Sequence, residues 1–70
     1  MMPLTFLDEG KPGVIKKIGG KAETRQFLEN LGFVPGSVVT VVTKISGNII
    51  VNVRESRVAI SREMATQIMI

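Results

Sequence analysis

The chain of 70 residues contains no histidine, cysteine, tyrosine or tryptophan. Histidine is the usual general base near neutral pH, and cysteine supplies the thiolate nucleophile. Imidazole nitrogen and cysteine sulfur are also the ligands of most transition-metal sites in proteins. We therefore expect a protein that is not an enzyme and that holds no cofactor.

Carboxylates are also scarce, because Asp and Glu together number six. Asp8 and Glu9 are adjacent, and the other four acidic residues are isolated along the chain. Neighbouring side chains of an extended segment point to opposite sides, so these two are poorly placed to hold one ion together. We expect no metal site within the chain. Asp8 or Glu9 could either solvate a loop or add oxygen ligands to a weak site completed by a partner.

Two further absences concern the cellular compartment. A small secreted domain usually needs disulfides, so a chain without cysteine is typical of a reducing compartment, most simply the cytoplasm. The start of the sequence, "MMPLTFLDEG", has no basic segment followed by an apolar run and does not resemble a signal peptide. No apolar stretch approaches the roughly 20 residues that span a bilayer. We expect a cytoplasmic protein that reaches a membrane only through a partner.

β-Branched residues dominate the apolar part of the sequence, with 17 Val and Ile against four Leu and three Ala. Such side chains favour strands over helices. Gly and Pro fall in short breaks between β-like segments, a spacing typical of small barrels. We predict a single domain over residues 1–70, mainly β, with about five antiparallel strands in a small SH3-like barrel.

Two segments depart from the β pattern. Residues 22–31, "AETRQFLENL", are the one good helix candidate, with Phe27, Leu28 and Leu31 forming a narrow apolar stripe. Residues 61–64 predict a 3₁₀ turn with Ser61 as its N-cap, a position where SH3-like barrels commonly have one. A further short turn is expected near Leu4, before the first strand.

The stretch "ENLGFVPGSVV", residues 29–39, predicts a tight corner after the helix. Gly32 stands where a helix ends with positive φ, and Pro35 and Gly36 fit the central positions of a type II turn. Phe33 and Val34 lie between these structural residues. Phe33 could pack onto the end of the helix or face a partner, and we retain both Phe33 and Val34 as candidate contact residues.

The chain is basic, with a net charge of +3, and residues 11–25 carry five cations against one glutamate. This segment could attract phosphate, anionic lipid or an acidic protein surface, or could simply keep the domain solvated. Arg25, Arg54 and Arg57 are candidate contacts to acidic groups of a partner. An alternative function is an SH3-like nucleic-acid binder using residues 11–25, although the three phenylalanines give little support for base stacking.

Two segments carry a resemblance to a known family. "LGFVPGSVV" at 31–39 and "VAISREMATQI" at 58–68 resemble the FeoA family, and the similarity extends over essentially the whole chain. The resemblance implies a small cytoplasmic SH3-like accessory protein of bacterial ferrous iron uptake. It implies a non-enzymatic protein-interaction module for FeoB, the membrane iron transporter with a cytoplasmic G-protein domain, and no nucleic-acid partner. Exposed strand edges also make a homo-oligomer plausible.

Overall fold

The computed structural model describes residues 1–70 and contains six strands, two helices and one 3₁₀ turn. In chain order these are η1 (Leu4–Phe6), β1 (Pro12–Val14), β2 (Lys17–Ile18), α1 (Ala22–Asn30), β3 (Val38–Ile45), β4 (Asn48–Val53), β5 (Ser56–Ser61), α2 (Arg62–Ala65) and β6 (Ile68–Met69). The prediction of a mainly β, antiparallel fold is confirmed. The sixth strand arises because "GVIKKI", expected as one strand, divides into β1 and β2, which pair with different partners.

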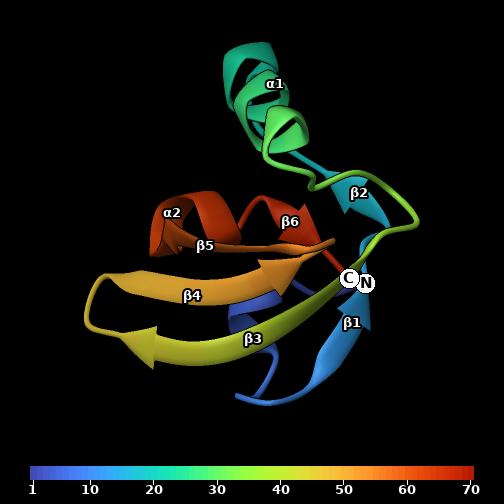
Figure 1. The fold of residues 1–70 in the computed structure, drawn as a ribbon. Coiled ribbons are helices and arrows are strands. Elements are labelled where there is room, and N and C mark those ends of the chain that lie inside the picture. Colours follow the sequence, from blue (N-terminus) through green and yellow to red (C-terminus); the bar gives the residue numbers. More distant parts are fainter.

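The strands form two antiparallel sheets. Four of them pair in the order β1-β3-β4-β5, and β2 pairs with β6 in a second, two-stranded sheet. Figure 1 shows the long β3–β4 hairpin, with α2 beside β5 and the two chain ends next to each other. The ends are joined by two backbone hydrogen bonds between Met2 and Ile70, with N–O distances of 2.9 and 2.8 Å. The first and last segments of the chain thus meet on one side of the molecule.

The register of β3 on β4 decides which of its valines are buried. Val39 lies opposite Val53 and Val41 opposite Val51, and all four have no exposed surface. The pairing shifts by one residue between Val41 and Thr43, a β-bulge that accommodates a bend in the strand. Beyond this bulge the alternation between the inner and outer face changes, which brings Lys44 opposite Ile49.

One hydrophobic core holds these elements together, and it contains no buried polar or charged residue. Its thirteen members are Leu4, Ile15, Ile18, Leu28, Phe33, Val39, Val41, Ile49, Val51, Val53, Ile60, Ala65 and Ile68. Nearly every element contributes at least one of them, including η1 and both helices. Most of these core residues are Val and Ile, whose branched side chains have few rotamers and therefore lose little entropy on burial.

The helix predicted at residues 22–31 is present as α1, one residue shorter at its C-terminus. The predicted apolar stripe is wrong in part: Leu28 is fully buried, whereas Phe27 is 48% exposed. Figure 1 gives the reason, since α1 projects away from the sheets and meets the rest of the fold near its C-terminal end. Only the side chains on this end and side of α1 can reach the core.

The turn after Ser61 is a short α-helix, α2, which corrects the predicted 3₁₀ turn at 61–64. The Thr66 N–H donates to the Arg62 carbonyl at 3.0 Å, which is the i to i−4 bond of an α-helix. Ser61 caps this helix, because its hydroxyl accepts a hydrogen bond from the Met64 N–H at 3.2 Å. The 3₁₀ turn of the chain is η1, near Leu4.

Candidate functional site

The corner, residues 32–36, begins at the C-terminus of α1. Gly32 has a φ of +106° and its N–H donates to the Glu29 carbonyl, while the Phe33 N–H donates to the Leu28 carbonyl, each at 3.0 Å. These two bonds are the Schellman arrangement, in which a glycine with positive φ satisfies the last carbonyls of a helix. The accompanying apolar contact is expected between Leu28 and Phe33, and both side chains are fully buried.

The turn that follows completes the corner. Gly36 has a φ of +93°, and the Ser37 N–H donates to the Val34 carbonyl at 3.0 Å across Pro35 and Gly36. The Gly36 N–H donates to the Ile15 carbonyl at 2.8 Å, which ties the turn to the loop between β1 and β2. This geometry directs the chain from α1 into β3, so these residues have a structural role.

Phe33 was a candidate contact residue, and the structure corrects that prediction. Its side chain is 0% exposed, and it is the largest of the fully buried side chains. A side chain without accessible surface offers nothing to a partner, so Phe33 belongs to the core. Val34 is half-buried and is the one apolar candidate of the corner with exposed surface.

The three candidate arginines are all exposed and lie on three different parts of the fold. Arg25 is on α1, and Arg57 is on β5, where its Nε donates to the Asn52 side chain at 3.1 Å. Arg54 follows β4 with a φ of +55°, and its Cδ lies 3.3 Å from the position that a Cβ on Gly32 would take. The structure therefore brings Arg54 onto the corner and shows no contact that joins the other two to it.

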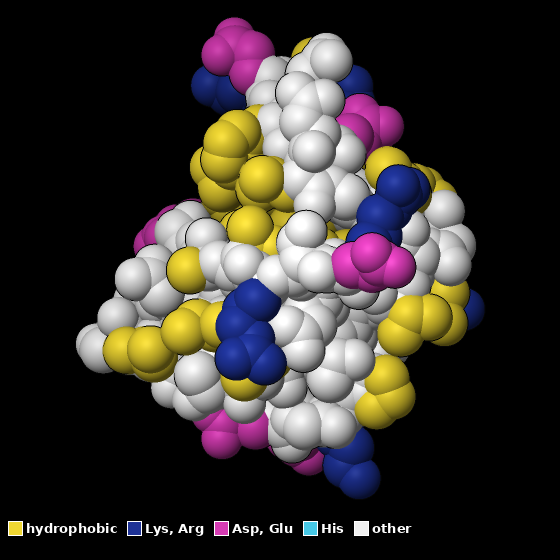
Figure 2. Space-filling view, in the orientation of Figure 1, with side chains coloured by type: hydrophobic (Ala, Val, Ile, Leu, Met, Phe, Trp, Pro, Cys, Tyr) yellow, Lys and Arg dark blue, Asp and Glu magenta, His cyan; other side chains and the backbone are white.

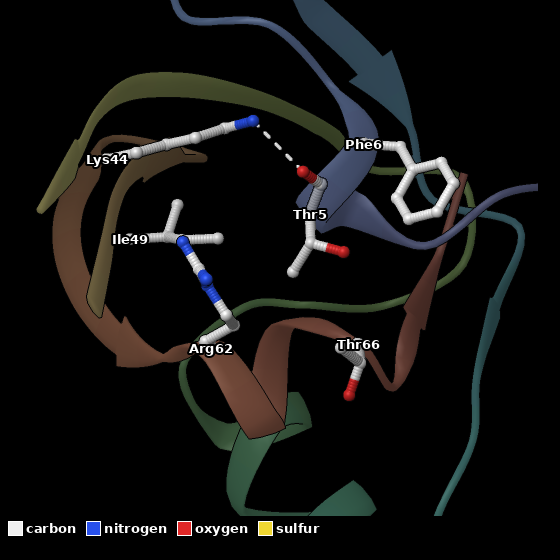
Figure 3. A pocket seen from close by; sticks show the side chains of 6 residues that line it. All are labelled: Thr5, Phe6, Lys44, Ile49, Arg62 and Thr66. Carbon is white, nitrogen blue, oxygen red and sulfur yellow. Dashed lines mark hydrogen bonds between the residues drawn. The ribbon is translucent and has the colours of Figure 1, made fainter. Parts of the chain in front are cut away.

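A second surface feature was not found from the sequence. It is a hollow of about 310 Å³, called here the Phe6 hollow. Its six lining residues are Thr5, Phe6, Lys44, Ile49, Arg62 and Thr66. Figure 3 shows that Lys44 and Arg62 extend over it from opposite walls, with Thr5 and Phe6 of η1 on a third side.

Local structure explains why Phe6 lies outside the core. The η1 turn buries Leu4 completely and leaves Leu7 packed against the core, and of the two residues between them Thr5 is half-buried and Phe6 points outward. Phe6 is accordingly 69% exposed, the most exposed of the three phenylalanines. Ile49 also lines the hollow but is only 1% exposed, so of the two apolar lining residues it is Phe6 that offers accessible surface.

Glu9 holds the β3 end of the Phe6 hollow in place. Its Oε2 accepts hydrogen bonds from the Lys44 backbone N–H at 2.6 Å and from the Thr43 hydroxyl at 2.9 Å. These bonds, together with the nearby Lys44 charge, lower the pKa of Glu9 from its ordinary value. The Lys44 ammonium in turn donates to the Thr5 carbonyl at 2.9 Å, across the hollow (Figure 3).

Sequence reasoning missed the Phe6 hollow because its parts are distant in the chain. Thr5 and Lys44 are 39 residues apart, and no motif links either of them to Arg62. One signal was present: the expected short turn that places Leu4 and Leu7 on one side leaves Phe6 on the other. The two cations could not have been assigned to the hollow without the register of β3 and the position of α2.

The exposed side chains of the chain are of kinds that suit contact with a partner. No group of three or more acidic, histidine or cysteine residues is placed to hold a metal ion. The chain offers exposed cations and exposed apolar side chains, and the latter include Phe6, Phe27 and Val38. None of its helices has the length and apolar character needed to cross a membrane.

The distribution of charge on the surface is mixed. Figure 2 shows Lys and Arg side chains interspersed with acidic and apolar ones over the visible face, with no single extended basic patch there. The five cations of residues 11–25 are all exposed. They belong to β2, α1 and the loops around β1 and β2.

The comparisons with known proteins agree on one family. The FeoA domain family matches residues 2–70. A candidate Fe(2+) transport protein A from Methanocaldococcus jannaschii is 34% identical over 70 residues, which cover 100% of this chain and 85% of that protein.

Two solved FeoA structures are similar to this chain over nearly its whole length. The crystal structure of an iron uptake regulatory protein, FeoA, is 31% identical and has a TM-score of 0.86, covering 96% of this chain and 89% of that one. Stenotrophomonas maltophilia FeoA, solved with zinc and described as an SH3 domain protein, is 25% identical with a TM-score of 0.85, covering 99% and 88%. The SH3-like fold predicted from the sequence is thereby confirmed.

Proposed function

Because this chain belongs to the FeoA domain family, we propose that it works by docking onto FeoB, the membrane iron transporter, at its cytoplasmic G-protein domain. The chain is a non-catalytic accessory protein of ferrous iron transport. The observation that carries the proposal is the family match over residues 2–70. Its place of action is the cytoplasm, where the G-protein domain lies.

The structure supports a docking role through what the surface offers. One exposed aromatic ring, Phe6, and two cations, Lys44 and Arg62, are found together at the Phe6 hollow, and this combination favours contact with an acidic protein surface. Val34, Arg25, Arg54 and Arg57 remain candidate contacts elsewhere. A homo-oligomer would form through the outer edges of β1 and β5, which have no neighbour in the sheet.

The direct test is binding of the purified chain to the soluble G-protein domain of the cognate transporter, by isothermal titration with GDP and with a non-hydrolysable GTP analogue. We expect saturable binding in at least one nucleotide state. Absence of binding in both states would contradict docking on this domain. Light scattering of the chain alone, over a range of concentrations, measures whether it also self-associates.

A nucleic-acid function is the alternative, and one observation favours it. Phe27 is exposed on the same helix as Arg25, in a segment whose cations are all exposed. An aromatic beside cations is the minimum needed for base stacking. A gel-shift assay at low and moderate salt decides, since release of counterions makes such binding fall steeply with salt. If no oligonucleotide binds at low salt, this alternative is excluded.

A further inference from the structure

We propose that the Phe6 hollow binds an acidic side chain of a peptide segment in a protein partner, with the Phe6 ring contacting an apolar residue beside it. The lining supplies two cations, two threonines and two apolar side chains, and no carboxylate. That this segment belongs to the FeoB transporter rests on the proposed function. The chemistry of recognition is argued from the hollow itself.

The first argument is that the Arg62 guanidinium has no partner within the chain. Six hydrogen bonds in the structure involve side chains, and none of them uses Arg62. Arg62 is also exposed, and Figure 3 shows its side chain extending over the hollow. A planar guanidinium with free N–H groups pairs best with a carboxylate or a phosphate, which it can bind through two parallel hydrogen bonds.

The second argument is that Lys44 is held in place and still has donors to spare. Its ammonium uses one of three N–H groups on the Thr5 carbonyl, and its backbone is fixed by Glu9. Glu9 does not line the hollow, and its Oε2 already accepts two hydrogen bonds. A preorganised cation loses little entropy when it binds an anion, so Lys44 is suited to this role.

The third argument concerns the choice between a peptide and a free anion. Although Ile49 in the lining is only 1% exposed, Phe6 at the edge of the hollow is 69% exposed and offers accessible apolar surface. A free phosphate would leave this apolar surface in water, whereas a peptide can bury it with one side chain while a neighbouring carboxylate meets the cations. A volume of about 310 Å³ is near the lower end for ligand pockets and suits one or two side chains.

The experiment is a ¹⁵N NMR titration of the whole chain with the capped peptide Glu-Leu-Glu-Leu-Glu, and with Gln-Leu-Gln-Leu-Gln as the uncharged match. We expect the acidic peptide to shift the amide signals of Thr5, Phe6, Lys44 and Thr66 in a saturable way. The glutamine peptide should not. No saturation by about 1 mM acidic peptide, or equal binding of both peptides, overturns the proposal.

The variant Arg62→Gln should weaken binding of the acidic peptide about fivefold, the upper range for an exposed ion pair. Its control is Lys17→Gln, which removes the same charge from an exposed side chain of β2 that does not line the hollow and should leave binding unchanged. Phe6→Ala should weaken binding without changing thermal unfolding. If Lys17→Gln weakens binding as much as Arg62→Gln, only net charge is at work and the hollow is not the site.

Two further experiments are needed. The first tells whether the hollow prefers a peptide over other anions, and the second separates peptide binding from docking onto the G-protein domain. Inorganic phosphate and vesicles containing phosphatidylglycerol should not compete at equal charge concentration; if either displaces the peptide fully, the hollow is a general anion site. If Arg62→Gln loses the peptide but binds the G-protein domain normally, the hollow is not part of that docking surface and the proposed function stands. If the wild type binds the peptide but not the G-protein domain, the hollow is a peptide site and the proposed docking onto the G-protein domain is contradicted.

Discussion

Truncation of Phe33 to alanine should destabilise the fold severely. The side chain is 0% exposed, and a buried aromatic removes roughly 150–250 Å² from water, or about 4–6 kcal/mol of transfer free energy. Because alanine keeps the Cβ and the surroundings relax in part, we expect a loss of about 3–5 kcal/mol in the free energy of unfolding. A domain of this size has about 4–10 kcal/mol in total, so Phe33→Ala should lie close to unfolding.

The measurement is urea unfolding followed by far-ultraviolet circular dichroism, since the chain has no tyrosine or tryptophan for fluorescence. Phe33→Leu, which keeps most of the volume, should fold and lose about 1–2 kcal/mol. Phe27→Ala is the matched control: its ring is 48% exposed, and we expect a loss below about 1 kcal/mol. If Phe33→Ala loses no more than Phe27→Ala, the burial of Phe33 is refuted and its role as a contact residue returns.

Three further changes test local features of the fold. Gly32→Ala should cost about 1–2 kcal/mol, and more than Gly10→Ala, because both residues have positive φ but only at Gly32 would the new Cβ meet the arginine stem at 3.3 Å. Ser61→Ala should cost about 1 kcal/mol through loss of the α2 cap, whereas Ser46→Ala in the β3–β4 turn should be nearly neutral; equal effects in urea unfolding would contradict the cap. Glu9→Gln tests pH dependence: since folding lowers the Glu9 pKa, its contribution is complete above the ordinary value of 4.5 and is lost on acidification. The stability difference between wild type and this variant, measured from pH 7 to pH 3, should therefore shrink below pH 4.5, and a constant difference would contradict the lowered pKa.

Much of the fold could be predicted because it depends on local signals. Gly32 ends α1 by its positive φ, and the alternation of Ile49, Val51 and Val53 places all three in the core. The division of "GVIKKI" into β1 and β2 was less accessible. It depends on which strands meet these residues, and pairing partners distant in sequence leave no trace in a six-residue pattern.

The helix shows why burial is harder to predict than secondary structure. The spacing of Phe27, Leu28 and Leu31 is correct for an apolar stripe, yet only Leu28 is fully buried. Periodicity tells which side of a helix is apolar, and says nothing of how much of that side meets the rest of the fold. Since α1 projects from the sheets (Figure 1), most of its length has nothing to pack against.

Phe33, which the sequence left open between packing and partner contact, is buried, whereas Phe6, to which the sequence assigned no role, is exposed. Phe33 is held inside by the Schellman bonds at the end of α1, and Phe6 is turned outside by η1. Both placements follow from backbone hydrogen bonds rather than from side-chain hydrophobicity, which is the same for the two rings. The variants Phe6→Ala and Phe33→Leu should therefore separate surface from core: the first should lower peptide binding at unchanged stability, and the second should lower stability with the folded protein still binding the acidic peptide.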